Sequence, residues 1–138
     1  MKLNWFPASA PANNSFAAAT LIGGQSGSTS ATTVNATRET GEPVHGTGAA
    51  KSIWFQWTAP KSGTLTLDTI GSSFDTLLGI YTGSAVGALT KKATNDDLSS
   101  SNRQSRIVIA VMSGTVYRFA VDGCNGASGA VTLRWSLP

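Results

Sequence analysis

The chain has 138 residues with a formal net charge of +3, and 41% of its residues are hydrophobic while only 12% are charged. That length suits one domain. The 34 serine and threonine residues and 15 glycines are typical of short strands joined by polar turns, and they disfavour helical bundles and coiled coils. No apolar run approaches the roughly 20 residues that a membrane-spanning helix needs, so membrane insertion is not expected.

Basic and metal-binding residue types exclude several further functions. The lysines and arginines are scattered, and only Lys91 and Lys92 are adjacent, so no nucleic-acid partner is expected. Cys124 is the only cysteine and His45 the only histidine. An intrachain disulfide and Cys₄ or Cys₂His₂ zinc sites are therefore impossible. A Cys124–His45 thiolate pair is disfavoured, because nearby carboxylates would raise the pKa of the thiol. With no nucleophile elbow or phosphate loop, we expect no enzyme.

Hydrophobic periodicity predicts the elements in chain order. Residues 1–15, with two prolines and several alanines, are predicted to be a linker or an added N-terminal segment, and 16–138 to be a single domain. Phe16 to Ile22 favours one helical turn. Alternating apolar residues between Gly, Ser and Pro turn signals then predict strands at 25–36, 51–59, 63–70, 75–82, 89–95, 105–112, 115–122 and 129–137. About eight strands, each with one apolar face, predict an all-β fold, an antiparallel two-sheet β-sandwich of jelly-roll type.

The seven acidic residues gather at one end of this predicted fold. If successive strands reverse direction, alternate connections share one end, which we call the acidic pole; these connections are 37–50, 71–74, 96–104 and 123–128. Every acidic residue lies in them or at the neighbouring strand ends. Calcium binds 6–8 oxygen ligands, and the alternative is that the acids close turns. The predicted ligands of a structural Ca²⁺ ion are Glu42, Asp75, Asp96, Asp97 and Asp122.

Two aromatic residues have the parity of an outer sheet face. Trp54 and Tyr81 alternate with the inward-facing residues of their strands. Exposed aromatic rings stack on sugar rings because the sugar has an apolar face. The predicted ligand-binding residues are therefore Trp54, Gln56, Tyr81, Arg118 and Arg134. The alternative, which we favour for Trp54, is burial beneath the N-terminal segment, where Trp5, Phe6 and Phe16 are available to cover it.

Several segments together resemble the bacterial pre-peptidase C-terminal domain family. They are Asn13-Asn14-Ser15-Phe16, ATRETGEPVH (36–45), SIWFQWTAPKSGTLTLDT (52–69), SSFDTLLGIYTG (72–83), ATNDD (93–97) and YRFAVDG (117–123). The resemblance begins near residue 13 and covers nearly all of the chain. Asp75, Asp96, Asp97 and Asp122 match acidic positions of the family's pattern. The chain departs from that pattern by lacking Asp at 13–15 and by having Cys124 where an aromatic residue is common.

The resemblance implies a secreted or cell-surface accessory module attached to a larger enzyme. The function that we expect is non-catalytic binding of an extracellular polymer, polysaccharide above all, with a covalently attached catalytic domain as the other partner. Two alternatives stay open: a ligand-free structural domain that supports secretion or maturation of an attached protease, and a module that binds a protein polymer.

Overall fold

The computed structural model describes residues 10–43, 45–46, 48–96 and 103–138, and in them every regular element is a strand or a short 3₁₀ helix. One sheet has five strands, in the order β1 (Thr20–Ile22), β3 (Ile53–Thr58), β8 (Val116–Gly123), β5 (Thr76–Thr82) and β6 (Thr90–Asn95). The other has four, in the order β2 (Ser26–Thr32), β9 (Ala130–Ser136), β4 (Gly63–Asp68) and β7 (Arg106–Val111). The 3₁₀ helices are η1 (Phe16–Ala18), η2 (Val86–Ala88) and η3 (Cys124–Gly126). No helix in these described ranges is long and apolar enough to cross a membrane.

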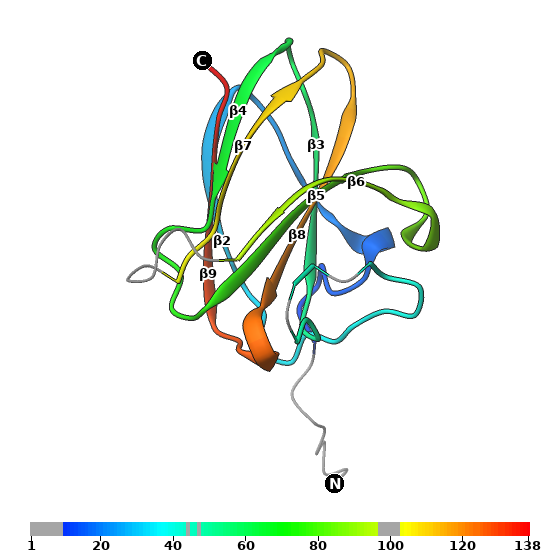
Figure 1. Cartoon of the computed structure of the whole chain (residues 1–138), viewed down its shortest axis with the longest axis vertical. Helices are drawn as coiled ribbons and strands as arrows, with labels where there is room; N and C mark the ends of the chain where they lie inside the picture. Colours follow the sequence, from blue (N-terminus) through cyan, green and yellow to red (C-terminus); the bar gives the residue numbers. More distant parts are fainter. Residues whose placement is uncertain (1–9, 44, 47, 97–102) are drawn as a thin grey trace, which may run out of the picture.

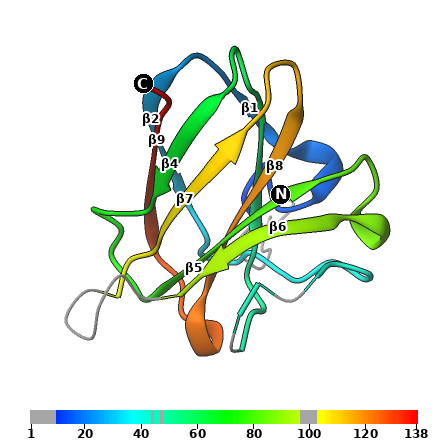
Figure 2. The same ribbon diagram turned by 45° about the horizontal axis from the view of Figure 1, so that its top comes forward.

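The two sheets face each other as layers of a sandwich (Figure 1). The chain alternates between the sheets from β2 to β5, and β5 and β6 then form a hairpin, which lies across the lower part of Figure 2. The predicted all-β sandwich and its eight predicted strands are confirmed as β2 to β9. Strand β1 was not predicted, and it runs parallel to β3 at the sheet edge, with Leu21 opposite Gln56.

The core between the sheets is made by the residues whose alternation predicted an inward face. Ile53, Phe55 and Trp57 of β3 pack with Leu65 and Leu67 of β4 in one buried cluster. The alternating residues of β5, β7, β8 and β9 complete it, namely Leu78, Ile80, Ile107, Val111, Tyr117, Phe119, Val121, Val131, Leu133 and Trp135. Burial of this apolar surface is the main favourable contribution to folding, and the inward parity predicted for these residues is confirmed.

Asn13 and Asn14, which precede β1, are hydrogen-bonded to the folded domain. The amide of Trp54 donates to the carbonyl oxygen of Asn13 at 3.0 Å, and the Asn13 side-chain amide donates to the carbonyl oxygen of Trp54 at 3.1 Å. Asn14 in turn exchanges hydrogen bonds with Thr37. The domain boundary predicted between residues 15 and 16 therefore falls inside a segment that is already bonded to the sheet.

Candidate functional site

A second, smaller core covers the outer face of the five-stranded sheet. Trp54 and Tyr81 are fully buried there with Phe16 and Ala120. The ring of Phe16 meets the Trp54 indole edge to face, with centroids 5.1 Å apart. The expectation that Trp54 and Tyr81 present rings to solvent is therefore wrong, and the favoured alternative of an N-terminal cover is confirmed for Phe16. Trp5 and Phe6 lie outside the described residues.

The remaining predicted ligand-binding residues lie on two different faces. The Arg118 guanidinium lies 4.8 Å from the centroid of the Phe16 ring, and it donates hydrogen bonds to the side chain of Gln56 and to the carbonyl oxygen of Gly83. Both residues thus help to hold the cover over Trp54. Arg134 belongs to β9 of the opposite sheet. The predicted set does not form one site, because parity assigns a residue to an inner or outer face without saying which sheet it is on.

The outer face of the four-stranded sheet carries an open hollow of about 400 Å³. Asp68 on β4 is buried and accepts two hydrogen bonds from the Arg134 guanidinium, at 2.9 and 3.2 Å. The register places Ser28 and Asp68 on either side of Arg134. Around this ion pair the lining is mainly hydroxyl-bearing, and it comprises Ser26, Gly27, Ser28, Thr66, Trp135 and Ser136.

The loops predicted to share the acidic pole do meet. The amide of Gly126 donates to the carbonyl oxygen of Gly48. The amide of Cys124 donates to the carbonyl oxygen of Asp75, at 2.9 Å. The predicted metal ligands nevertheless separate into two groups, Asp75 and Asp96 with Cys124, and Glu42 and Asp122 with His45. Asp97 lies outside the described residues. Antiparallel connectivity predicted the common end correctly, but it could not predict the grouping of side chains within it.

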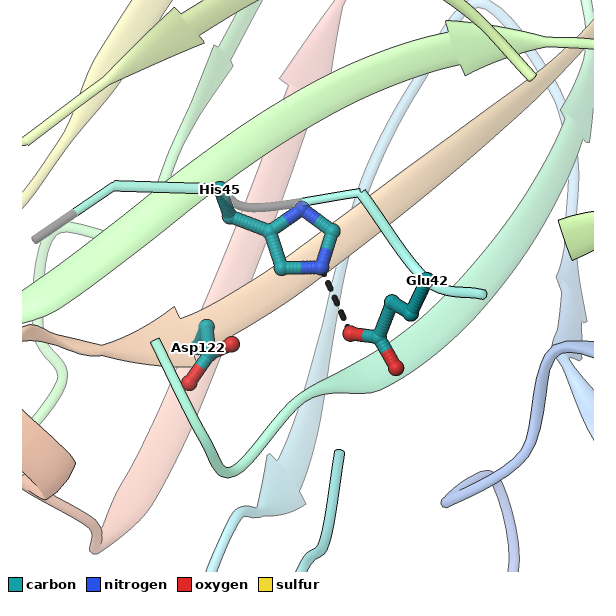
Figure 3. Close-up of side chains that lie close together, drawn as sticks. All are labelled: Glu42, His45 and Asp122. Carbon is teal, nitrogen blue, oxygen red and sulfur yellow. Dashed lines mark hydrogen bonds and ion pairs between the residues drawn. The ribbon is translucent and has the colours of Figure 1, made fainter. Parts of the chain in front are cut away.

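Glu42, His45 and Asp122 form a buried group at this pole (Figure 3). His45 Nε2 lies 2.7 Å from Glu42 Oε1, and His45 Nδ1 lies 2.6 Å from the Tyr81 hydroxyl. The second Glu42 oxygen accepts from the Glu39 amide at 2.9 Å. The imidazole thus connects the loop that carries Glu42 to β5. It lies next to Trp54, and the centroids of the two rings are 5.4 Å apart.

Asp122, at the end of β8, supplies the third side chain. Its Oδ1 accepts hydrogen bonds from the amides of Ala50, Lys51 and Gly123. Its Oδ2 is buried and has no hydrogen-bond partner. In Figure 3 one oxygen of this carboxylate points toward the Glu42–His45 pair and the other points away from it. The three amides therefore fix the position of Oδ1, whereas Oδ2 can still accept a bond from a further partner.

Burial and hydrogen bonding determine the charge of this group. Burial by itself raises the pKa of Glu42, but hydrogen bonds from His45 and from the Glu39 amide outweigh that effect, and the net pKa lies below its ordinary value. Burial raises the pKa of Tyr81, and the Glu42 and Asp122 carboxylates raise it further. Glu42 is therefore ionised at neutral pH, and Tyr81 keeps its proton.

The sequence pointed to Glu42 and Asp122 but not to His45 as their partner. From the sequence, His45 was considered only as a possible catalytic partner of Cys124. Its three-residue spacing from Glu42 was the available signal. That signal is weak in a loop, where no regular periodicity specifies which side chains meet.

The fold defined by these strands is a jelly-roll β-sandwich. The pre-peptidase C-terminal domain of collagenase from Bacillus anthracis has a similar structure, with a TM-score of 0.54 over 87% of this chain and 94% of that domain. The sequence identity is 10%, so the likeness concerns the fold. No family model and no curated protein matches the sequence.

Proposed function

We propose that this chain is a non-catalytic accessory module of a secreted protein, and that it binds an extracellular polysaccharide in the hollow of the four-stranded sheet. The observation that carries the proposal is the lining of that hollow, where the Arg134–Asp68 pair lies among hydroxyl side chains. Sugar hydroxyls both donate and accept hydrogen bonds. A guanidinium that donates, a carboxylate that accepts and serines that do both are complementary to them.

The form of the hollow favours a polymer over a small molecule. It lies on the face of a sheet and is open to solvent, whereas small-molecule pockets bury most of the ligand's surface. Residues of β2, β9 and β4 line it, so a chain of sugars would cross several strands. The structural likeness to a domain of a collagenase supports attachment to a larger, exported enzyme, and hence a secreted or cell-surface location.

Affinity gel electrophoresis against soluble plant and microbial polysaccharides tests the proposal. The test variant is Ser28→Gln with Ser136→Gln, two exposed hydroxyl residues that line the hollow. The matched control is Thr94→Gln, an exposed residue on β6 of the other sheet. We expect one class of glycan to retard the unmodified chain and the control but not the double variant. Equal retardation of all three proteins would contradict the proposed site.

A second candidate is a ligand-free structural domain, and one observation favours it. The large hydrophobic residues exposed in the described part of the chain are Leu21, Val34, Val108 and Met112, none of them aromatic. The broadly exposed aromatic ring that many sugar-binding surfaces use for stacking is therefore not among them, and Trp135 in the hollow is only 7% exposed. The absence of retardation on every glycan would support this candidate. Retention by collagen or gelatin alone would instead indicate a protein polymer as the ligand.

A further inference from the structure

Two carboxylates and one imidazole are enclosed together at the acidic pole. One ligand atom from each of Glu42, His45 and Asp122 lies within 4.8 Å of the others, and all three residues are buried. We propose that these residues bind one divalent transition-metal ion of the zinc type. The inference is independent of the proposed polysaccharide binding, which concerns the outer face of the other sheet.

The charge of the group is the first argument. Buried charges are costly unless they are paired. Glu42 is ionised, and Asp122 Oδ1 accepts hydrogen bonds from three backbone amides, which carry no formal charge. A neutral imidazole compensates neither carboxylate, and a protonated one would compensate only one. When both carboxylates are ionised, negative charge is in excess in either state of the imidazole, and a divalent cation would balance it.

The unpartnered oxygen of Asp122 is the second, independent argument. Asp122 has no solvent-exposed surface, and its Oδ2 has no hydrogen-bond partner. Buried polar atoms are nearly always bonded, so an exception needs an explanation. One Asp122 oxygen points at the Glu42–His45 pair in Figure 3. A metal ion between these side chains would give the Asp122 carboxylate a partner on the side of that pair.

The donor set selects the class of ion. Calcium prefers 6–8 oxygen ligands, whereas this group offers three side chains, one of them a nitrogen donor. Imidazole with carboxylates suits zinc and related transition ions. Zinc-bound nitrogen and oxygen atoms in tetrahedral sites are roughly 3.3 Å apart, given bond lengths of about 2.0–2.2 Å. The 2.7 Å between His45 Nε2 and Glu42 Oε1 must therefore widen by about half an ångström.

Tyr81 would orient the imidazole from its other side. One arrangement of the metal-free protein that satisfies both contacts has Tyr81 donating to Nδ1 and the Nε2–H group donating to Glu42. With a metal on Nε2, the ring proton is on Nδ1 and donates to the Tyr81 oxygen. In that arrangement the ring carries one proton before and after the metal binds, so it loses no net proton. Metal-binding histidines commonly have such a partner on the second nitrogen.

The test uses the whole chain with Cys124→Ser, so that the Asp75–Asp96–Cys124 group loses its sulfur ligand. Metal is removed with a chelator, and thermal unfolding is followed after separate additions of Zn²⁺, Co²⁺ and Ca²⁺. We expect Zn²⁺ at a hundredfold excess over its Kd to raise Tm by on the order of 10 °C. Asp122→Asn should remove this increase, whereas Asp96→Asn, the matched control in the other group, should keep it.

A second measurement needs no substitution at a ligand. Because His45 is the only histidine, its imidazole nitrogens give unique NMR signals. We expect one equivalent of Zn²⁺ to shift the Nε2 signal and to leave the ring proton on Nδ1. Unchanged imidazole signals, a Tm increase from Ca²⁺ as large as that from Zn²⁺, or an effect that disappears in Asp96→Asn would each overturn the proposal.

Discussion

Asn13 and Trp54 bond each other in both directions, since the Trp54 amide donates to the Asn13 carbonyl oxygen and the Asn13 side chain donates to the Trp54 carbonyl oxygen. Asn13 is only 4% exposed, so its side chain could not exchange this bond for one to water. The pair fastens the covering segment to β3. These two hydrogen bonds join the backbone of β3 to the residues that lead into the Phe16 cover.

Replacing Asn13 by Ala should lower the free energy of unfolding by about 1–3 kcal/mol, the cost of leaving a buried carbonyl group without its partner. Chemical denaturation measures the change. Asn14→Ala is the matched control, because its bonds to Thr37 are exposed, and it should cost less than about 1 kcal/mol. Equal losses in the two variants would show that burial of the Asn13 bond is not what matters.

Trp54→Ala should destabilise the domain by about 3–5 kcal/mol, the usual cost of deleting a large buried side chain. Glycan retention per folded molecule should stay unchanged, because the indole is fully buried. Denaturation curves and affinity gels measure the two properties separately. The control is Leu21→Ala, at a site 74% exposed on β1, where we expect little change in stability. Loss of retention by a folded Trp54→Ala protein would restore Trp54 as a ligand-binding residue.

The raised pKa of Tyr81 predicts a loss of stability at high pH. In the unfolded chain a tyrosine ionises near pH 10, whereas burial and the nearby carboxylates raise the pKa of Tyr81 in the folded state. Above about pH 10 the folded protein therefore keeps the Tyr81 hydroxyl proton that the unfolded chain loses. The free energy of unfolding then falls by up to about 1.4 kcal/mol per pH unit. In the metal-free protein, Tyr81→Phe should show a shallower decline between pH 9 and 11.5. Parallel curves would contradict this.

Gly123 should tolerate no side chain. A Cβ built there would lie 1.6 Å from the carbonyl oxygen of Ala127, and because this obstacle is backbone, no rotamer change can relieve it. Gly123→Ala should cost upward of about 3 kcal/mol and disturb the loop after β8. Gly87→Ala, where no atom lies within 4 Å, should leave stability nearly unchanged. Thermal unfolding of both variants measures the difference, and a stable Gly123→Ala protein would argue against this loop conformation.

The strands were predictable because their apolar residues alternate and the turns between them are rich in glycine and serine. Strand β1 was not, because Thr20–Ile22 is only three residues long and none of them is fully buried. Its pairing with β3 depends on contacts with residues more than 30 positions away. Short edge strands of this kind carry little signal of their own.

The candidate site was predictable only to the level of loops. Seven acidic residues at alternate connections indicated a common end, and the loops do meet there. The separation of Glu42 and Asp122 from Asp75 and Asp96 depends on loop conformation, which has no periodicity to interpret. The burial of Trp54 was likewise undecided by parity, because an outward residue is exposed only if nothing covers it.

The two cores differ in how they are closed. The large one lies between two hydrogen-bonded sheets, whereas the small one around Trp54 is closed by Phe16 and by a loop. Opening the small core breaks no strand pairing between β3, β8 and β5. We therefore expect residues 13–19, which cover Trp54, to detach as a unit while the sandwich stays folded. In native-state hydrogen exchange, the amides of these residues should exchange at denaturant concentrations far below the global transition. The free energy of opening the cover would then be smaller than the free energy of unfolding the sandwich.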